Sequence, residues 1–553
     1  MSVTANDELV NVYRKLDAKI ADEVYRQSSG NVYETVAVVP SLEAKERSKA
    51  VFQGLLKEAQ ALEAPDPVFS LVKDHLVEFL QGRISGVESS YLHLNRFIGA
   101  QTRLVDFSTR QDSRPASKRA EVLEARFGQM DAVWDGVKNL LGNVPVDKIR
   151  EVVRACEVLD TVATAAVAKI DERYEGLSTG ERAKLLAGLQ DLAAKARVWK
   201  SQAEQEAASR PQESVAAKTQ DESLDAQRKR YGQVLEEECG VSLAELLKWH
   251  EEEMAGTRAE LIETAVKTGL QPVKSQQDAF EILEKYGGPC DTVEEMFERM
   301  IKYVATAKAA TKDGYVDLPE ETCLVVPTPE QNKDDFPWGG YGGGCHRRRP
   351  LVGACFLNDS NYKAVTDGWL KMMAIHECYP GHHAQWVRST LDTLPETVKL
   401  GSRATPLMEG TAHRSEKLME WIFPDDPVFP LFVRLRRHHT AVRIKADLML
   451  HYFGRPIDEI VELYMKELGF DRNSARGQVR YQERNPGYMT CYYYGMKKLG
   501  DLQAQSGLGD KAFTQLLFAV GRISLRNFAK FLALTDADKK RFQTEFDSLV
   551  PAD

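Results

Sequence analysis

The sequence lacks the features of a membrane protein. None of its apolar runs approaches the roughly 18–20 residues that a membrane-spanning helix requires. Its first residues, MSVTANDELVNVYRKLDAK, are polar and charged, unlike the apolar centre of a signal peptide. These absences favour a cytoplasmic protein with no membrane partner.

Concentrated positive charge and paired cysteines are lacking as well. The net charge is −9, whereas nucleic-acid binding needs a concentrated basic surface, so we expect no nucleic-acid partner. The eight cysteines include no Cys-x-x-Cys pair, which predicts reduced and mostly buried thiols. The chain of 553 residues has the composition of a globular protein. It is longer than the chain length at which one hydrophobic core stops growing.

Helical periodicity dominates the first 310 residues. Leu9, Val12 and Leu16 recur at intervals of three and four residues, the spacing of one helical face. Similar stripes occur over residues 66–82, 117–141, 146–172, 181–207, 223–254 and 291–308. We therefore predict a helical N-terminal lobe over residues 1–310.

The pattern changes over residues 313–358, where a small β-sheet or hairpin is predicted. Short β-prone runs at 315–318, 323–326 and 351–357 lie between prolines and glycines. The glycines of 337–344 are expected to let the backbone bend or approach a substrate closely. Helical patterns then return, beginning with a His-Glu helix over 361–390. Residues 311–553 thus form a predicted catalytic lobe, integrated with the first lobe in one mainly α-helical unit.

Residues 376–383 read His-Glu-Cys-Tyr-Pro-Gly-His-His, close to the zinc-hydrolase motif His-Glu-x-x-His. In a continuous helix His382 would lie about 240° round from His376, and His383 roughly 10 Å further along the axis. A local bulge at the Pro-Gly pair would absorb the two extra residues. The sequence therefore predicts His376 and His382 as metal ligands, with His383 as the alternative to His382. Glu377 is the predicted general base.

A third ligand is expected from a later helix. Glu409 and Glu416 are seven residues apart and share one helical face. We predict Glu409 as the ligand of one divalent metal, with zinc expected because two imidazoles and a carboxylate suit it. Glu416 is predicted to support the ligands, to contact substrate or to be a solvated helix residue. His413 either orients Glu409 or is a surface histidine.

These motifs resemble those of the bacterial Domain of Unknown Function 885 family, which is grouped with the gluzincin metallopeptidases. The resemblance rests on His-Glu-x-x-Pro-Gly-His-His, on the Glu-Gly helix at 409–410 and on the late tyrosine-rich block. Where that family often has Glu-Gly-Trp-Ala-x-Tyr-x-Glu, this chain has Glu-Gly-Thr-Ala-His-Arg-Ser-Glu. Both aromatic positions are therefore replaced.

A more distant resemblance is to the Taq-type thermostable metallocarboxypeptidases. Residues 442–447, Val-Arg-Ile-Lys-Ala-Asp, are similar to their Ile-Arg-x-x-Ala-Asp motif. Residues 487–495, Gly-Tyr-Met-Thr-Cys-Tyr-Tyr-Tyr-Gly, are similar to their Gly-Tyr-Phe-Pro-Thr-Tyr-x-x-Gly motif. This resemblance implies a multi-helix fold with a deep cleft, carboxypeptidase activity and a homodimer. It also implies that Tyr492, or second Tyr488, donates a hydrogen bond to the oxyanion.

A carboxypeptidase needs a cation for the terminal carboxylate of its substrate, and arginine forms the bidentate bond. We predict Arg480 for this role, and a structural ion pair with Asp447 for Arg443. The predicted function is metal-dependent hydrolysis of peptide bonds by an enzyme similar to a zinc metallocarboxypeptidase, with a peptide or small amide as its substrate. The alternatives are hydrolysis of a non-peptide amide or ester, and a non-catalytic helical binding protein with a degenerate metal site.

Overall fold

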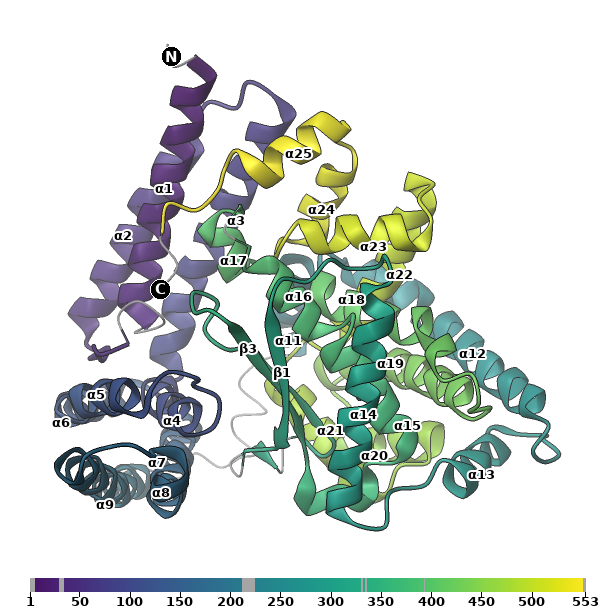
Figure 1. Ribbon diagram of the computed structural model, residues 1–553, viewed down its shortest axis with the longest axis horizontal. Helices are drawn as coiled ribbons and strands as arrows, with labels where there is room; N and C mark the ends of the chain where they lie inside the picture. Colours follow the sequence, from purple (N-terminus) through teal and green to yellow (C-terminus); the bar gives the residue numbers. More distant parts are fainter. Residues whose placement is uncertain are drawn as a thin grey trace.

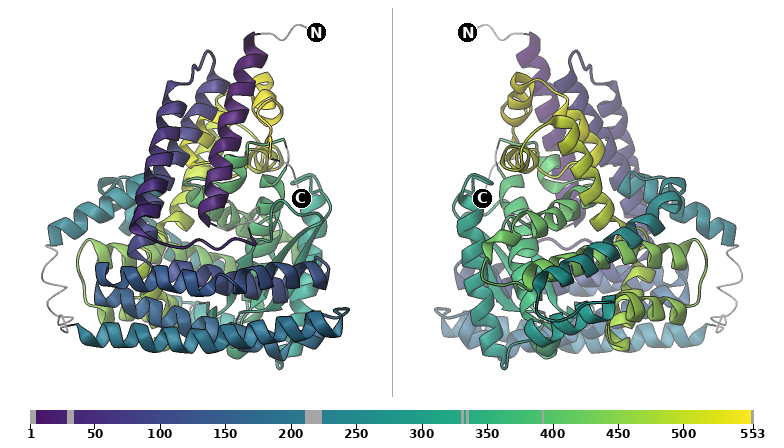
Figure 2. Two further views of the ribbon diagram at one scale, coloured as in Figure 1. Left: turned by 90° about the vertical axis from the view of Figure 1, so that its left-hand side faces the viewer. Right: turned by 90° about the vertical axis from the view of Figure 1, so that its right-hand side faces the viewer.

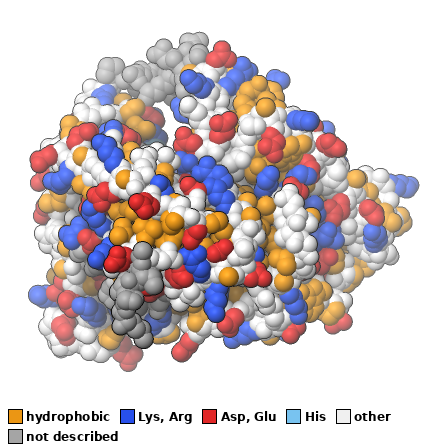
Figure 3. Space-filling model, turned by 90° about the horizontal axis from the view of Figure 1, so that it is seen from above, with side chains coloured by type: hydrophobic (Ala, Val, Ile, Leu, Met, Phe, Trp, Pro, Cys, Tyr) orange, Lys and Arg blue, Asp and Glu red, His pale blue; other side chains and the backbone are white. Residues whose placement is uncertain are grey.

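The computed structural model describes residues 5–28, 34–210, 224–329, 332–333, 336–391 and 393–550. Over these residues the protein is mainly α-helical with one small sheet, which confirms the predicted fold class. None of the described helices combines the length and the apolar character needed to cross a membrane. On the face shown in Figure 3, acidic and basic side chains are interspersed.

The two ends of the chain pack together (Figure 1). Helices α1 (Ala5–Ser28), α2 (Leu42–Ala61) and α3 (Pro67–Leu92) share a core with α23 (Asp510–Ala519), α24 (Leu525–Leu532) and α25 (Asp536–Thr544). Phe69 of α3, for example, meets Phe546 edge-on with ring centroids 5.2 Å apart. The same core includes residues of α14 (Val293–Lys312) and of the segment that carries the His-Glu motif. The division of the chain at residue 310 stays a prediction.

A second core joins helices that lie across the base of α1–α3 in Figure 2. Trp134 and Trp199 stack within it, with ring centroids 5.4 Å apart. The helices are α4 (Asn95–Arg110), α5 (Ala116–Phe127), α6 (Met130–Leu140), α7 (Val146–Ala168), α8 (Ile170–Arg173) and α9 (Thr179–Ser209).

The remaining helices lie before and after the sheet in the chain. Before the sheet they are α11 (Leu224–Val234), α12 (Leu243–Thr268) and α13 (Gln276–Tyr286). After it they are α15 (Asp367–Met373), α16 (His382–Ser389), α17 (Glu396–Leu400), α18 (Thr405–Leu418), α19 (Phe429–His451), α20 (Ile457–Leu468), α21 (Arg472–Arg484) and α22 (Thr490–Ser506).

The predicted small sheet is present and is mixed, but the run at 315–318 forms no strand. Strands β1 (Glu321–Pro327), β2 (Gly339–Gly342) and β3 (Leu351–Leu357) are ordered β1-β3-β2. β1 runs parallel to β3, and β2 forms an antiparallel pair with it. The central strand is mostly buried, and α16 packs on it, so the sheet lies directly beside the His-Glu motif.

The continuous His-Glu helix expected over 361–390 is interrupted. α15 ends at Met373, and a π-helical turn over Ala374–Cys378 carries His376 and Glu377. Tyr379 is extended, the Tyr379–Pro380 peptide is cis, and α16 begins at His382. The Pro-Gly pair therefore separates two helices, where the sequence suggested a bulge within one.

Candidate metal centre

The Pro-Gly interruption is built around Gly381. A Cβ atom at this position would lie 1.8 Å from the backbone oxygen of His376. Only glycine leaves room for so close an approach of two backbone segments. Because the chain folds back here, the His382 ring comes within 4.9 Å of the His376 ring, centroid to centroid.

Three side chains converge on one point in the way the motif predicts. The ligand atoms of His376, His382 and Glu409 all lie within 4.8 Å of one another. The Oε2 atom of Glu409 lies 3.6 Å from Nε2 of His376 and 3.2 Å from Nε2 of His382. Ligands about 2.0–2.1 Å from a tetrahedral zinc lie about 3.3 Å from one another. The spacing and the donor types therefore fit a zinc ion.

His383 points to a different part of the molecule. Its Nε2 atom lies 2.6 Å from the Glu321 carboxylate on β1, and its Nδ1 atom lies 3.0 Å from the Tyr341 hydroxyl on β2. The imidazole is fully buried. The structure thus brings His382 to the candidate metal centre and gives His383 a structural ion pair with the sheet.

Glu409 is positioned by close packing of α18 on α22. A Cβ atom at Gly410 would lie 2.4 Å from the backbone of Gly495, so the two helices touch through glycines. Tyr488, just before α22, donates a 2.6 Å hydrogen bond to the Oε1 atom of Glu409. This bond leaves Oε2 facing the two histidines. In metal sites, hydrogen-bond partners of this kind fix the orientation of a ligand.

Behind His376 lies a buried chain of polar groups. Nδ1 of His376 lies 2.8 Å from the Glu416 carboxylate, whose other oxygen lies 3.1 Å from His413. The Thr440 hydroxyl is 2.8 Å from the far nitrogen of His413. Glu416 is fully buried, so the structure places it behind a ligand, away from solvent and from the pocket. His413 contacts Glu416 and does not reach Glu409.

The carboxylates make this site favourable for positive charge. Burial opposes a charge on His376, but the bonds to Glu409 and Glu416 outweigh it and raise the pKa of the imidazole to about 10. Burial raises the pKa of both carboxyl groups, but their interactions with neighbouring histidines have the larger effect. The pKa of each therefore lies well below the usual value. A cation at the point where the three side chains meet would be stabilised in the same way.

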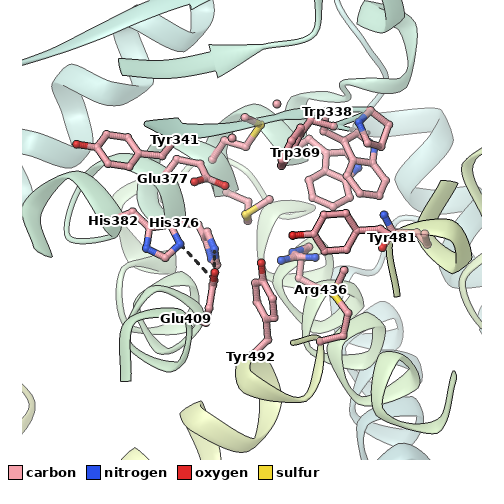
Figure 4. A pocket seen from close by; sticks show the side chains of 18 of the residues that line it. Trp338, Tyr341, Trp369, His376, Glu377, His382, Glu409, Arg436, Tyr481 and Tyr492 are labelled. Carbon is pink, nitrogen blue, oxygen red and sulfur yellow. Dashed lines mark hydrogen bonds and ion pairs between the residues drawn. The ribbon is translucent and has the colours of Figure 1, made fainter. Parts of the chain in front are cut away.

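Glu377 faces an open pocket next to these residues. The pocket has about 840 Å³ of empty space, a figure that includes the solvent at its open mouth. Figure 4 shows the Glu377 carboxylate on the pocket side of His376. Tyr492 also lines the pocket, with its ring stacked 6.0 Å from that of His376 and its hydroxyl 3.3 Å from that of Tyr488. Burial, reinforced by the Glu409 carboxylate, raises the pKa of both tyrosines well above the usual value, so both remain hydrogen-bond donors.

The structure contradicts the predicted substrate contact of Arg480. Arg480 is exposed on α21 and does not line the pocket, because Gln478 and Tyr481 occupy the pocket side of that helix. Residue 480 lies about 100° round the helix from residue 481 and points elsewhere. Arg443 lines the pocket instead, and its guanidinium donates to Oε1 of Gln478 at 3.2 and 2.8 Å.

The predicted pair between Arg443 and Asp447 does not form either. Asp447 accepts hydrogen bonds from the Tyr231 hydroxyl and from the backbone N–H of Gly487, both at 2.9 Å. It thereby fixes the turn that leads into Tyr488 and α22. The two later motifs are thus tied together by a hydrogen bond between side chain and backbone.

Sequence reasoning missed most of the pocket wall. Arg436, Gln478, Trp369 and Tyr481 line the pocket from three different helices, so no local motif unites them. One signal was available in the glycine-rich stretch, whose Gly339 and Gly340 also line the pocket.

The fold and the site together define a mainly helical protein with a candidate metal centre beside an open pocket. Residues 25–526 match the family described as "Bacterial protein of unknown function (DUF885)", and the chain belongs to this family. No curated protein matches the sequence.

Two solved structures are similar in fold. A candidate lipoprotein from Colwellia psychrerythraea has a TM-score of 0.75 at 14% identity, with 96% of this chain and 99% of that chain covered. A candidate lipoprotein of unknown function from Shewanella oneidensis has a TM-score of 0.70 at 15% identity, with 94% and 100% covered. At these identities the likeness concerns the fold alone. The cytoplasmic location suggested by the sequence stays a prediction.

Proposed function

We propose that the protein is a zinc-dependent peptide hydrolase that removes residues from the C-terminus of its substrates. His376, His382 and Glu409 would hold the ion. The observation that carries this proposal is the convergence of these three groups, with Glu377 beside them, at one pocket. A divalent ion supplies a Lewis acid that polarises a carbonyl group and acidifies a water molecule.

Glu377 has the position and freedom of a general base. Within the described chain, its carboxylate forms no ion pair or hydrogen bond that would neutralise it, and it lines the pocket. It can accept a proton from water and pass it to the leaving amine. Tyr492 supplies a hydroxyl donor for the oxyanion. Tyr488 lies 3.3 Å from the Tyr492 hydroxyl and donates its own hydrogen bond to Glu409.

Arg443 supports cleavage at a free C-terminus. Its side chain is only 6% exposed, yet among the described residues no carboxylate pairs with it. Burial and the nearby charge of Arg436 lower the pKa of its guanidinium, whose charge is offset by the Oε1 atom of Gln478 and by the face of the Tyr492 ring, 5.1 Å away. An unpaired buried charge costs several kcal/mol. A substrate carboxylate would remove that penalty and would form a charge-assisted hydrogen bond.

The nearby charges leave room for one anion. Arg436 lies 3.5 Å from the Glu416 carboxylate, which neutralises the charge of the guanidinium. Glu377 and Glu409 together balance a divalent ion. Arg443 is then the one remaining positive charge among these groups, which suits a single carboxylate. The resemblance of residues 442–447 and 487–495 to motifs of the Taq-type carboxypeptidases points the same way.

Two measurements test the proposal together. The purified protein is analysed for metal and then incubated with peptides blocked at the N-terminus, in parallel with Glu377→Gln. We expect one zinc per chain and release of C-terminal residues by the wild type only. Amidated copies of the same peptides are expected to resist. A zinc-loaded wild type that releases no residue would refute the peptidase proposal.

A further inference from the structure

The pocket extends from the metal centre to an aromatic end. Trp338 and Trp369 stack there with ring centroids 4.1 Å apart, and Tyr481 lines the same pocket. In Figure 4 these three rings lie on the opposite side of the view from His382 and Glu409. The site therefore has a polar end for chemistry and an apolar end that the proposed reaction does not use.

The aromatic end is held in place by its neighbours. Arg436 lies over the ring of Trp369 at 5.0 Å, and Phe432 meets that ring edge-on at 5.3 Å. Trp338 is only partly buried, and it packs against Phe470 with centroids 5.8 Å apart. Tyr481 is likewise partly buried and packs on Tyr488 at 5.7 Å. The rings thus keep apolar surface available to a ligand without having to rearrange.

The charges separate along the pocket. Of the described residues that line it, the acidic ones are Glu377 and Glu409, and both belong to the metal end. The basic ones are Arg436, which pairs with Glu416, and Arg443, which has Gln478 as its hydrogen-bond partner. A ligand that fits must therefore carry one negative charge next to an uncharged apolar group.

We propose that the pocket selects peptides whose C-terminal residue is aromatic or a large aliphatic one. The side chain of that residue would pack against Trp338 and Tyr481 while its carboxylate meets Arg443. Trp338 and Tyr481 are then specificity-determining residues. The assignment rests on the proposed function and adds the substrate class to it. Burial of apolar area and contact between rings favour such a side chain over alanine, and the absence of a second unpaired cation among the described lining residues disfavours glutamate.

Binding can be measured apart from catalysis. The zinc-loaded Glu377→Gln variant is titrated by calorimetry with N-acetyl-phenylalanine, N-acetyl-alanine and N-acetyl-glutamate. We expect the phenylalanine ligand to bind at least about tenfold more tightly than the alanine ligand. In the same background, Trp338→Ala and Tyr481→Ala are expected to reduce this ratio, and circular dichroism checks that each variant is folded. Trp421→Ala, which removes a tryptophan that is 52% exposed, is the matched control and should leave the ratio unchanged.

The outcomes separate the two proposals. Equal affinity for the three ligands would overturn the specificity assignment, as would an unchanged ratio in both folded pocket variants. If wild-type protein hydrolyses peptides with no preference for their last residue, the specificity fails and the peptidase function stands. If the phenylalanine ligand binds preferentially but no peptide is cleaved, the pocket assignment stands and the peptidase function fails.

Discussion

Glu416 is the residue whose substitution tests most sharply how the metal centre is supported. Its carboxylate lies 2.8 Å from Nδ1 of His376, so it accepts the N–H that leaves Nε2 free for a metal. Removing such a partner lowers metal affinity about 10–100-fold. Glu416→Gln keeps an acceptor oxygen but loses the charge, so we expect a loss of about tenfold, or about 1.4 kcal/mol. Glu416→Ala removes the acceptor as well, and we expect a loss near the upper end, about 100-fold.

The assay is a competition for zinc against a chromophoric chelator of known affinity. Glu420→Gln is the matched control, because Glu420 pairs with Arg434 and does not contact the metal centre. Circular dichroism of the metal-free proteins separates loss of affinity from loss of fold, since Glu416 also lies 3.5 Å from Arg436. Wild-type zinc affinity in a folded Glu416→Ala variant would show that the hydrogen bond to His376 does not support a metal ligand.

Three further changes have distinct expected results. Arg443→Gln should raise KM about tenfold or more for peptides with a free C-terminus, because the substrate carboxylate loses its partner. For any amidated peptide that is cleaved, KM should stay unchanged. An equal rise in KM for both kinds of peptide would contradict a contact between Arg443 and the carboxylate. His383→Ala should lower the free energy of unfolding by about 2 kcal/mol in urea titrations, because Glu321 loses one buried partner but keeps its ion pair with Lys308, while zinc affinity stays as in the wild type. Burial opposes the charge on Glu396, but hydrogen bonds from His346 and Tyr25 hold its pKa at about 2, below the usual 4.5. A depressed carboxyl pKa stabilises the fold above about pH 4.5, and this stabilisation is lost as the pH falls towards 2. Urea titrations over that range should show a weaker pH dependence for Glu396→Gln, and an unchanged dependence would refute the assignment.

Local chemistry explains which features could be predicted from the sequence. The periodic apolar stripes and the β-prone runs beside the glycines predicted the mainly helical fold and the small sheet. The His-Glu pair and Glu409 carry ligand chemistry that is recognisable without a fold. The structure places them together, with His382 and not His383 beside His376 and Glu409.

The missed features depend on contacts between distant segments. The helix expected over 361–390 was wrong as a continuous element, because Gly381 allows the backbone to fold onto the carbonyl of His376. The i,i+4 spacing suggested that Arg443 pairs with Asp447, but the Gly487 N–H and the Tyr231 hydroxyl occupy that carboxylate. Residue type alone favours Arg480 as the substrate cation, but its position on α21 turns it away from the pocket.

The proposed function requires that His376, His382 and Glu409 form one metal site. A crystal structure of the zinc-loaded protein, with anomalous scattering recorded at the zinc edge, tests this most directly. We predict one anomalous peak, coordinated by Nε2 of His376, Nε2 of His382 and a carboxylate oxygen of Glu409, with His383 still bonded to Glu321. A zinc ion coordinated by His383, or no zinc at these residues in fully loaded protein, would contradict the account.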